Sequence, residues 1–263
     1  MSNINSKILS LIETSIKQGN ADINKFALNL IKNIKKIISP NDFQNLVEKN
    51  LSDKKIYFIR HAESLHNVLE QKYAYKEEME KWNVLDPKLT EKGIQQTNHT
   101  IEKIKESGIN FEAVFVSPLS RTIQTYFLIE KELNKEAKIF VTDFARELMS
   151  YLDKNKGKKL SLLKEEYKNT KLNFEYMTKE FWWFDLGQNK DNEYEGIDFS
   201  LRLQLFALWL AFRPEKNMLI ISHSHVFIEM QDSEGIRNAD MVKMYNKYLI
   251  INIVSLMKIS DKK

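Results

Sequence analysis

The sequence predicts an α/β fold built on a mostly parallel sheet. Four apolar segments are each followed directly by polar residues, and helix-length stretches lie between them. Strands that alternate with helices are typical of parallel sheets with right-handed crossovers. The carboxyl ends of such strands share one edge of the sheet, where ligands bind, so we expect the polar residues to gather there. The strand segments are 56–59, 113–116, 139–141 and 218–221, and the helical stretches are 90–107, 121–133 and 199–212.

A helical extension precedes the first predicted strand. Apolar residues recur at helical spacing between positions 4 and 50. Gly19 is expected to end the first helix, Asp22 to cap the second, and the Ser39-Pro40 pair to end that second helix. We therefore expect residues 1–52 to form a helical extension that packs on the core or on a partner chain, such as a second copy.

Two stretches depart from the alternation. Residues 241–257 hold two strand-like runs around Asn246-Lys247, which predict a hairpin at the sheet edge. Residues 152–198 are interpreted as an insertion rich in aromatic side chains. We expect this insertion to act as a lid over the ligand crevice, and the alternative is a small core of its own. Its aromatic residues include Trp182, Trp183 and Tyr194.

Composition narrows the function classes. The chain has no cysteine, which excludes disulfides, thiolate zinc sites and a cysteine nucleophile. The net charge of +4 is a small difference between 40 basic and 36 acidic residues, so we expect no nucleic-acid partner. No apolar run reaches the roughly 18–20 residues that span a bilayer, and a signal peptide is not recognisable. We expect no stable membrane insertion and a cytoplasmic location.

The polar residues after the predicted strands suit a phosphate group. Arg60 and Arg121 offer forked, permanently charged donors that match phosphate oxygens. His223 and the side chain of Asn67 could complete the ring of donors. A cation such as Arg121 opposes the dipole at a helix start, which favours an anion-binding role for it.

A histidine and a carboxylate could carry out the reaction itself. His61 follows the first predicted strand, where one ring nitrogen could attack phosphorus while the other donates to a backbone carbonyl. Glu147 follows the third strand and could protonate the leaving alcohol, then activate the water that clears the intermediate. A capping role is the alternative for Glu147.

These residues stand in motifs that resemble those of the histidine phosphatase superfamily, branch 1, also called phosphoglycerate mutase-like. Residues 60–67, Arg-His-Ala-Glu-Ser-Leu-His-Asn, are similar to its Arg-His-Gly-Glu-Ser-x-x-Asn signature. The resemblance implies a three-layer α/β/α sandwich with a mostly parallel central sheet, as the catalytic domain over residues 53–263. Four more matches follow in family order: Leu-Thr-Glu-Lys-Gly-Ile-Gln-Gln at 89–96, Ser-Pro-Leu-Ser-Arg-Thr-Ile-Gln-Thr at 117–125, Arg-Glu-Leu at 146–148 and Ser-His at 222–223.

The resemblance also implies the role of each site residue. It implies no metal and no other cofactor. Ala62 departs from the family pattern by replacing the usual Gly, and Ser224-His225 stands where two small residues are common. We expect the Ser224 N–H to bind phosphate, and we group His225 with the lid residues. The implied roles are phosphorylation at His61, a phosphate pocket of Arg60, Asn67, Arg121 and His223, and proton donation by Glu147.

The predicted activity is a metal-independent phosphatase that hydrolyses phosphomonoesters, either small molecules or phosphoproteins, through a phosphohistidine. One alternative is a mutase that returns the phosphoryl group to its substrate. A second is a non-catalytic phospho-ligand binding or scaffold protein whose N-terminal helices contact a partner. A third is a divalent-metal site made of His61, His223, His225 and a carboxylate. The two adjacent guanidinium groups would repel a cation there.

Overall fold

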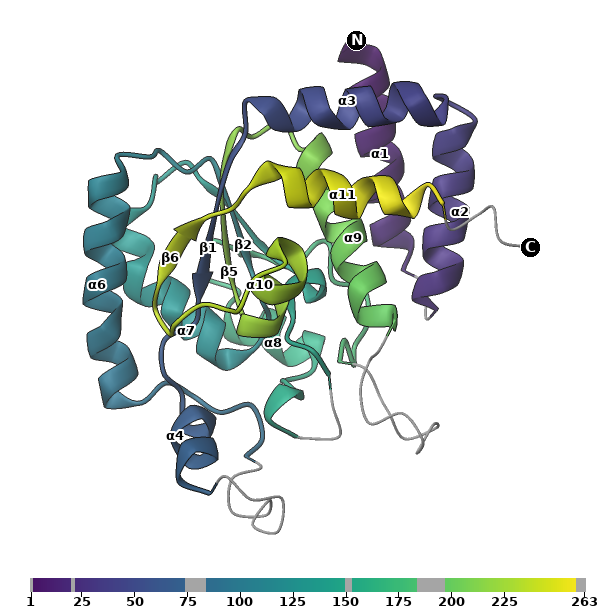
Figure 1. Cartoon of the computed structure of the whole chain (residues 1–263). Coiled ribbons are helices and arrows are strands. Elements are labelled where there is room, and N and C mark those ends of the chain that lie inside the picture. The colour runs from purple at the N-terminus through teal and green to yellow at the C-terminus, as the bar shows by residue number, and fades with distance from the viewer. Residues whose placement is uncertain (1, 20–21, 74–83, 150–152, 184–196, 259–263) are drawn as a thin grey trace.

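A central sheet forms the middle layer of the molecule (Figure 1). The computed structural model describes residues 2–19, 22–73, 84–149, 153–183 and 197–258. Within these residues the sheet has six strands in the order β4-β3-β2-β5-β1-β6, and only the edge strand β6 runs antiparallel to its neighbour. The strands are β1 (Lys55–Arg60), β2 (Ala113–Val116), β3 (Lys138–Val141), β4 (Leu172–Asn173), β5 (Asn217–Ser222) and β6 (Met241–Lys243).

Helices cover both faces of this sheet, which confirms the predicted α/β/α sandwich (Figure 1). Helices α6, α7 and α8 pack on one face, and α9, α10, α11 and the N-terminal helices pack on the other. The helices are α1 (Ser2–Gln18), α2 (Ile23–Lys35), α3 (Pro40–Ser52), α4 (Leu65–Lys72), α6 (Glu91–Ser107), α7 (Ser120–Ile129), α8 (Leu160–Glu166), α9 (Ile197–Phe212), α10 (Ser224–Gln231) and α11 (Asn246–Leu256), with 3-10 turns η2 (Glu130–Glu132), η3 (Asp143–Ala145) and η4 (Asp153–Asn155).

The two cores follow from the alternation of side chains along each strand. In β2, Ala113 and Phe115 pack in the core that contains α9, whereas Val114 and Val116 pack in the core that contains α7. All four residues are fully buried. Because both faces of the sheet are covered, the central parts of β1, β2, β3 and β5 are apolar, and this pattern predicts these four strands.

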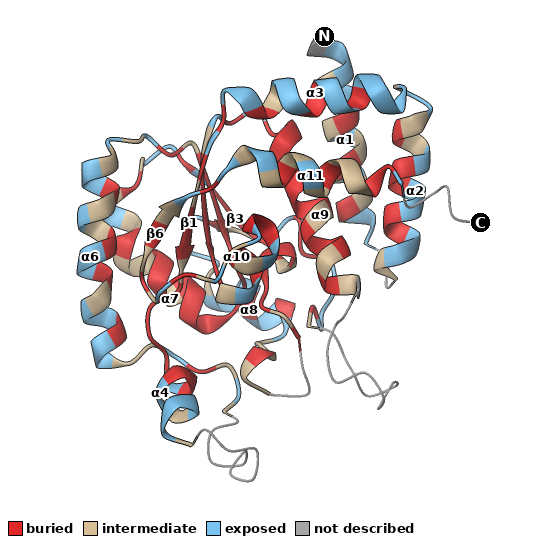
Figure 2. Ribbon diagram, in the orientation of Figure 1, coloured by how far each residue is buried: buried red, intermediate tan, exposed pale blue. Residues whose placement is uncertain are grey.

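Helix α9 is the most deeply buried crossover (Figure 2). Every residue from Leu201 to Phe212 except Gln204 is buried. It lies between the sheet and the layer formed by α1, α2, α3 and α11, so the predicted deep packing of residues 199–212 is confirmed. Despite such apolar helices, none in the described part of the chain is long and apolar enough to cross a membrane.

The N-terminal helices begin and end largely where the sequence indicates. Gly19, with φ of +62°, follows the end of α1, and the side chain of Asp22 caps α2. The prediction for Ser39-Pro40 is wrong, because α2 already ends at Lys35. Ser39 instead caps the start of α3, and Pro40 is the first residue of that helix. A proline fits there because the first turn needs no amide donor.

The predicted C-terminal hairpin is also wrong. Only the first run, β6, is a strand, and it pairs with the sheet edge at β1. From Asn246 onward the chain forms α11, which packs on α9 and α3. Its buried residues Leu249, Ile253 and Leu256 are spaced by four and three positions, as on one face of a helix. Tertiary packing therefore outweighs the strand preference of the β-branched residues in this run.

Candidate active site

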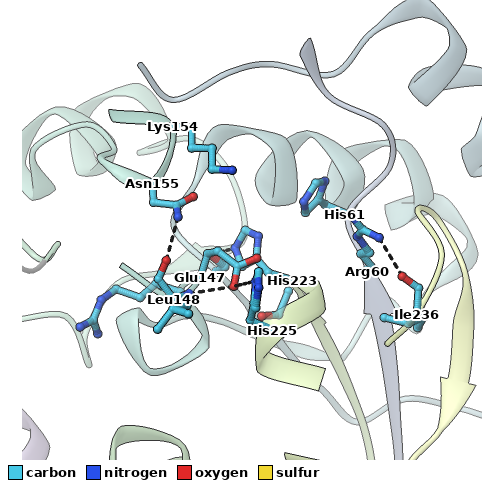
Figure 3. Close-up of polar contacts among 12 residues, drawn as sticks. Arg60, His61, Glu147, Leu148, Lys154, Asn155, His223, His225 and Ile236 are labelled. Carbon is cyan, nitrogen blue, oxygen red and sulfur yellow. Dashed lines mark hydrogen bonds and ion pairs between the residues drawn. The ribbon is translucent and has the colours of Figure 1, made fainter. Parts of the chain in front are cut away.

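The polar residues after four strands meet at the carboxyl edge of the sheet. His61 follows β1, His223 follows β5, Arg121 lies in the first turn of α7 after β2, and Glu147 follows η3 after β3. Since β1, β5, β2 and β3 are neighbours in the sheet, these side chains are brought together. Figure 3 shows His61, Glu147 and His223 around one space, with Arg60 beside His61.

His61 is held in a single neutral form. Its Nδ1 lies 2.8 Å from the carbonyl oxygen of Ala62, which can only accept a hydrogen bond, so Nδ1 carries the proton. Its Nε2 accepts a hydrogen bond from the Nε of Arg121 at 3.2 Å. Burial lowers the pKa of His61 well below its ordinary value, and the charges of Arg121 and Arg60 lower it further. Nε2 is therefore unprotonated at neutral pH, and its lone pair accepts the Arg121 N–H in this structure.

Arg121 is a fully buried cation at the centre of the site. Besides His61, its guanidinium donates to the Lys154 carbonyl oxygen at 2.9 Å and to Oδ1 of Asn155 at 3.0 Å. Burial lowers the pKa of Arg121 to about 10, against the opposing charges of Glu147 and Asp86, so the group remains charged at neutral pH. Among the described residues these contacts engage three of its five N–H groups, so the two others could donate to an anion.

Arg60 and His223 carry buried polar atoms that lack partners within the described residues. Arg60 donates from Nη1 to the Ile236 carbonyl oxygen at 2.9 Å, whereas its buried Nε–H is unpaired. His223 is completely buried, with Nε2 2.8 Å from Oγ of Ser117 and Nδ1 unpaired. The rings of His223 and His61 are 5.1 Å apart. Unpaired buried polar atoms are rare, and a phosphate group would give these ones partners.

Asn67 lies at the start of α4, where its amide belongs to the helix cap. Its Oδ1 accepts hydrogen bonds from the backbone N–H and the hydroxyl of Ser64, both at 3.1 Å. Its Nδ2 is 3.2 Å from Nε2 of His66, and the His66 ring is 5.8 Å from that of His61. The His66 ring thus engages one of the two N–H groups of the Asn67 amide, next to the His61 ring, and the phosphate contact of Asn67 stays a prediction.

Glu147 is buried beside α10. Its Oε1 accepts a hydrogen bond from the Leu148 N–H at 2.8 Å and lies 3.3 Å from Nδ1 of His225. Burial raises the pKa of Glu147, but the hydrogen bond and charge of His225, together with the Leu148 N–H and the charge of Arg121, hold the pKa below its ordinary value. Ser224, the first residue of α10, contributes one of the helix N-terminal N–H groups that have no intrahelical partner.

Residues of the family-like motifs also hold the loop after His61 in place. The carbonyl oxygen of Glu63 accepts a hydrogen bond from the Thr90 N–H, and the Glu63 N–H donates to the side chain of Gln96. At Gly93 an added Cβ would lie 2.0 Å from the Glu63 carbonyl oxygen. A glycine is therefore required at that position because α6 touches the backbone of the loop after His61.

Several residues that support the site were missed by the sequence analysis. Arg202 in α9 is buried and donates to the carbonyl oxygens of Phe144, Arg146 and Glu147, which fixes the chain around the carboxylate. Asp86 accepts hydrogen bonds from the backbone and hydroxyl of Ser120 and so holds the start of α7. Neither residue lies in a recognisable motif, and only the folded chain brings them to the site.

The predicted lid divides into parts with different roles. Its η4 turn does reach the site, since Lys154 and Asn155 contact Arg121. Trp182 packs in the hydrophobic core with its Nε1 bonded to the Lys158 carbonyl oxygen at 2.8 Å, which favours the alternative of a packing role. Trp183 packs edge-on against Trp182. Tyr194 lies outside the described residues.

Two further expectations concern metal ligands and Ala62. Within the described ranges, no group of three or more His, Asp or Glu side chains is arranged to hold a metal ion. Ala62 is not among the residues with positive φ, so the loop accepts alanine without backbone strain.

The sequence matches the family model of the histidine phosphatase superfamily, branch 1, over residues 56–231. The chain therefore belongs to this superfamily. No curated protein matches the sequence.

Solved structures with similar folds include three phosphatases. An ecdysone phosphate phosphatase from Bombix mori is 15% identical, with coverage of 74% of this chain and 90% of that one and a TM-score of 0.49. A candidate alpha-ribazole-5′-phosphate phosphatase from Escherichia coli is 20% identical, with coverage of 72% and 89% and a TM-score of 0.45. A phosphoserine phosphatase from Entamoeba histolytica is 17% identical, with coverage of 72% and 89% and a TM-score of 0.42.

Proposed function

We propose that this chain is a metal-independent phosphatase that hydrolyses phosphomonoesters through a phosphohistidine intermediate on His61. The observation that carries the proposal is the fixed tautomer of His61. Nδ1 keeps its proton and donates to the Ala62 carbonyl oxygen, so Nε2 is unprotonated, and the Arg121 N–H that it now accepts would turn to the substrate phosphate before attack. A neutral imidazole is the nucleophilic form, and its neighbour is a cation suited to the phosphate that it would attack. Membership of the superfamily supports the same class of activity.

The charge of a phosphate dianion can be met without a metal ion. Arg121 has two N–H groups left after its contacts with the protein, and Arg60 has a buried unpaired Nε–H. His223 and the N-terminus of α10 add further polar groups on the β5 side. Catalysis of phosphoryl transfer depends mostly on positioning and on such electrostatic stabilisation.

Glu147 is placed to handle the protons of both half-reactions. In the first, a bond forms between Nε2 of His61 and phosphorus while the ester P–O bond breaks, and Glu147 gives its proton to the leaving alcohol oxygen. In the second, the water oxygen bonds to phosphorus as the bond between phosphorus and Nε2 of His61 breaks, and Glu147 takes one proton from the water. The substrate class proposed is a phosphate ester carried by a small molecule or by a protein.

Hydrolysis of 4-nitrophenyl phosphate tests the proposal, with the His61→Ala variant compared with wild type, each with and without EDTA. Wild type should release inorganic phosphate equally in both conditions, and His61→Ala should lose about 10³-fold or more of this activity. His99→Ala is the matched control, because His99 is exposed on α6, far from the nucleophile in sequence. Undiminished hydrolysis by His61→Ala, or loss of wild-type hydrolysis in EDTA, would overturn the proposal. Transfer of the phosphoryl group back to an acceptor without phosphate release would identify a mutase.

A further inference from the structure

His225 forms a contact with Glu147 that the mechanism above leaves unused. It lies in the first turn of α10, two residues after His223, and its Nδ1 is 3.3 Å from Oε1 of Glu147 (Figure 3). The Glu147 side chain is 12% exposed, whereas that of His225 is 60% exposed. The pair therefore connects the buried carboxylate with the solvent.

The surrounding charges indicate where the proton of this pair resides. The hydrogen bond and charge of Glu147 raise the pKa of His225, against burial and the charges of Lys154 and Arg60. Burial would raise the pKa of Glu147, but His225 first, and then the Leu148 N–H and Arg121, hold it low. The charged groups Lys154, Arg60 and Arg121 come from η4, β1 and α7, and Leu148 lies in the segment after η3. Below the raised pKa of His225, the free protein thus holds imidazolium beside carboxylate.

We propose that His225 is a positioning residue that stores the proton which Glu147 gives to the leaving alcohol. The proposal rests on the proposed function, because it requires Glu147 to act as the proton donor. Its basis is the direct contact between the two side chains and their placement between the buried site and the solvent.

The proton moves in a closed cycle. When the phosphate dianion binds beside Glu147, its negative charge favours the protonated carboxyl, and the proton crosses from Nδ1 of His225 to Oε1 of Glu147. Glu147 passes it to the ester oxygen as the P–O bond breaks and the bond between His61 and phosphorus forms. The attacking water then gives one proton to Glu147 while its oxygen bonds to phosphorus and the bond between phosphorus and Nε2 of His61 breaks. Once phosphate leaves, the proton returns to His225, so the cycle needs no proton beyond those of the pair and the water.

The pH profile and the leaving group provide the test. His225→Asn removes the stored proton but keeps a polar side chain, and His99→Asn is the matched control on an exposed part of α6. We expect the basic limb of kcat/KM for an alkyl phosphate to move to lower pH by about one unit or more in His225→Asn, with a loss of about tenfold or more near pH 8. With 4-nitrophenyl phosphate the leaving group needs no proton, and the loss should stay below about threefold.

Each outcome decides the proposal. An unchanged basic limb in His225→Asn, or an equal loss with both leaving groups, would overturn it, since equal loss indicates damage to the site. An NMR titration gives a measure that is independent of turnover: the pKa of His225 should fall in Glu147→Gln, and an unaltered pKa would also overturn the proposal. A separate measurement distinguishes failure of the His225 proposal from failure of the proposed function. If wild type transfers no phosphoryl group from 4-nitrophenyl phosphate to His61, the proposed function itself is refuted.

Discussion

Acid should destabilise the fold steeply, because three histidines of the site are buried and neutral. His61, His66 and His223 are each at most 6% exposed. Burial lowers the pKa of each one, and the charge of Arg121 lowers it further. In the unfolded chain they titrate near the ordinary value of about 6.5. Below that pH the unfolded state binds more protons, so the stability is present above about pH 6.5 and is lost as the pH falls.

The magnitude follows from linkage. For each histidine that stays neutral in the folded state, the free energy of unfolding falls by about 1.4 kcal/mol for each pH unit below the pKa of that histidine in the unfolded chain. Lowering the pH from about 7.5 to about 5.5 therefore lowers the free energy of unfolding by about 4 kcal/mol for the three histidines together. His225 instead stabilises the fold as the pH falls, because Glu147 raises its pKa. This effect on the free energy of unfolding is smaller, because solvent screens the exposed His225 side chain.

Urea unfolding followed by far-UV circular dichroism and tryptophan fluorescence at several pH values measures this dependence. The wild type should lose stability progressively as the pH falls from about 6.5 to about 5.5. The variant His99→Asn should show the same slope, because His99 is exposed in α6. A change of less than about 1 kcal/mol over this interval would refute the assignment of the three rings as buried and neutral.

Two substitutions test the scaffold of the site. Gly93→Ala should lower the free energy of unfolding by about 1–3 kcal/mol, because its Cβ would lie 2.0 Å from the Glu63 carbonyl oxygen; unchanged thermal unfolding would contradict this packing. Asn155→Ala should cost about 1.5–3 kcal/mol, since it removes an acceptor from the buried Arg121 cation. The control for Asn155→Ala is Asn98→Ala, at an exposed position of α6. Equal denaturation midpoints for Asn155→Ala and Asn98→Ala would count against a structural role for Asn155.

The carboxyl edge of the sheet, where the candidate site lies, could be predicted because its sequence signals are local. Each apolar strand stops at its polar residues, and a parallel sheet necessarily places those ends together. The order of motifs then indicated which residue follows which strand, as found for His61, Arg121, Glu147 and His223. Their hydrogen-bonding roles beyond this placement depend on contacts between distant segments.

The errors arose where local pattern and tertiary packing compete. The β-branched run of α11 has the composition of a strand, yet its buried positions have helical spacing. The Ser39-Pro40 pair is compatible with the end of one helix and with the start of the next. The Ser39 side chain accepts a hydrogen bond from the Asp42 N–H, which shows that the pair begins α3. A capping pattern was thus present there in the sequence, but its direction was misinterpreted.

Contacts between side chains that lie far apart in the sequence and outside the family-like motifs could not be predicted. The pairing of His225 with Glu147 joins α10 to the segment after η3, and no spacing in the sequence indicates it. The same holds for Asn155, whose contact with Arg121 depends on the path of the insertion. The aromatic content of that insertion suggested a lid, but for Trp182 the core offers the larger apolar contact.

Trapping the phosphoenzyme is the most direct test of His61 as the nucleophile. Wild type is mixed with a ³²P-labelled aryl phosphate, quenched in alkali, and the labelled peptide is identified by mass spectrometry. We expect a label that is stable in alkali, labile in acid and located on His61, and that is absent from His61→Asn. A label on another residue, an equal label in His61→Asn, or hydrolysis by wild type with no label on His61 would contradict it.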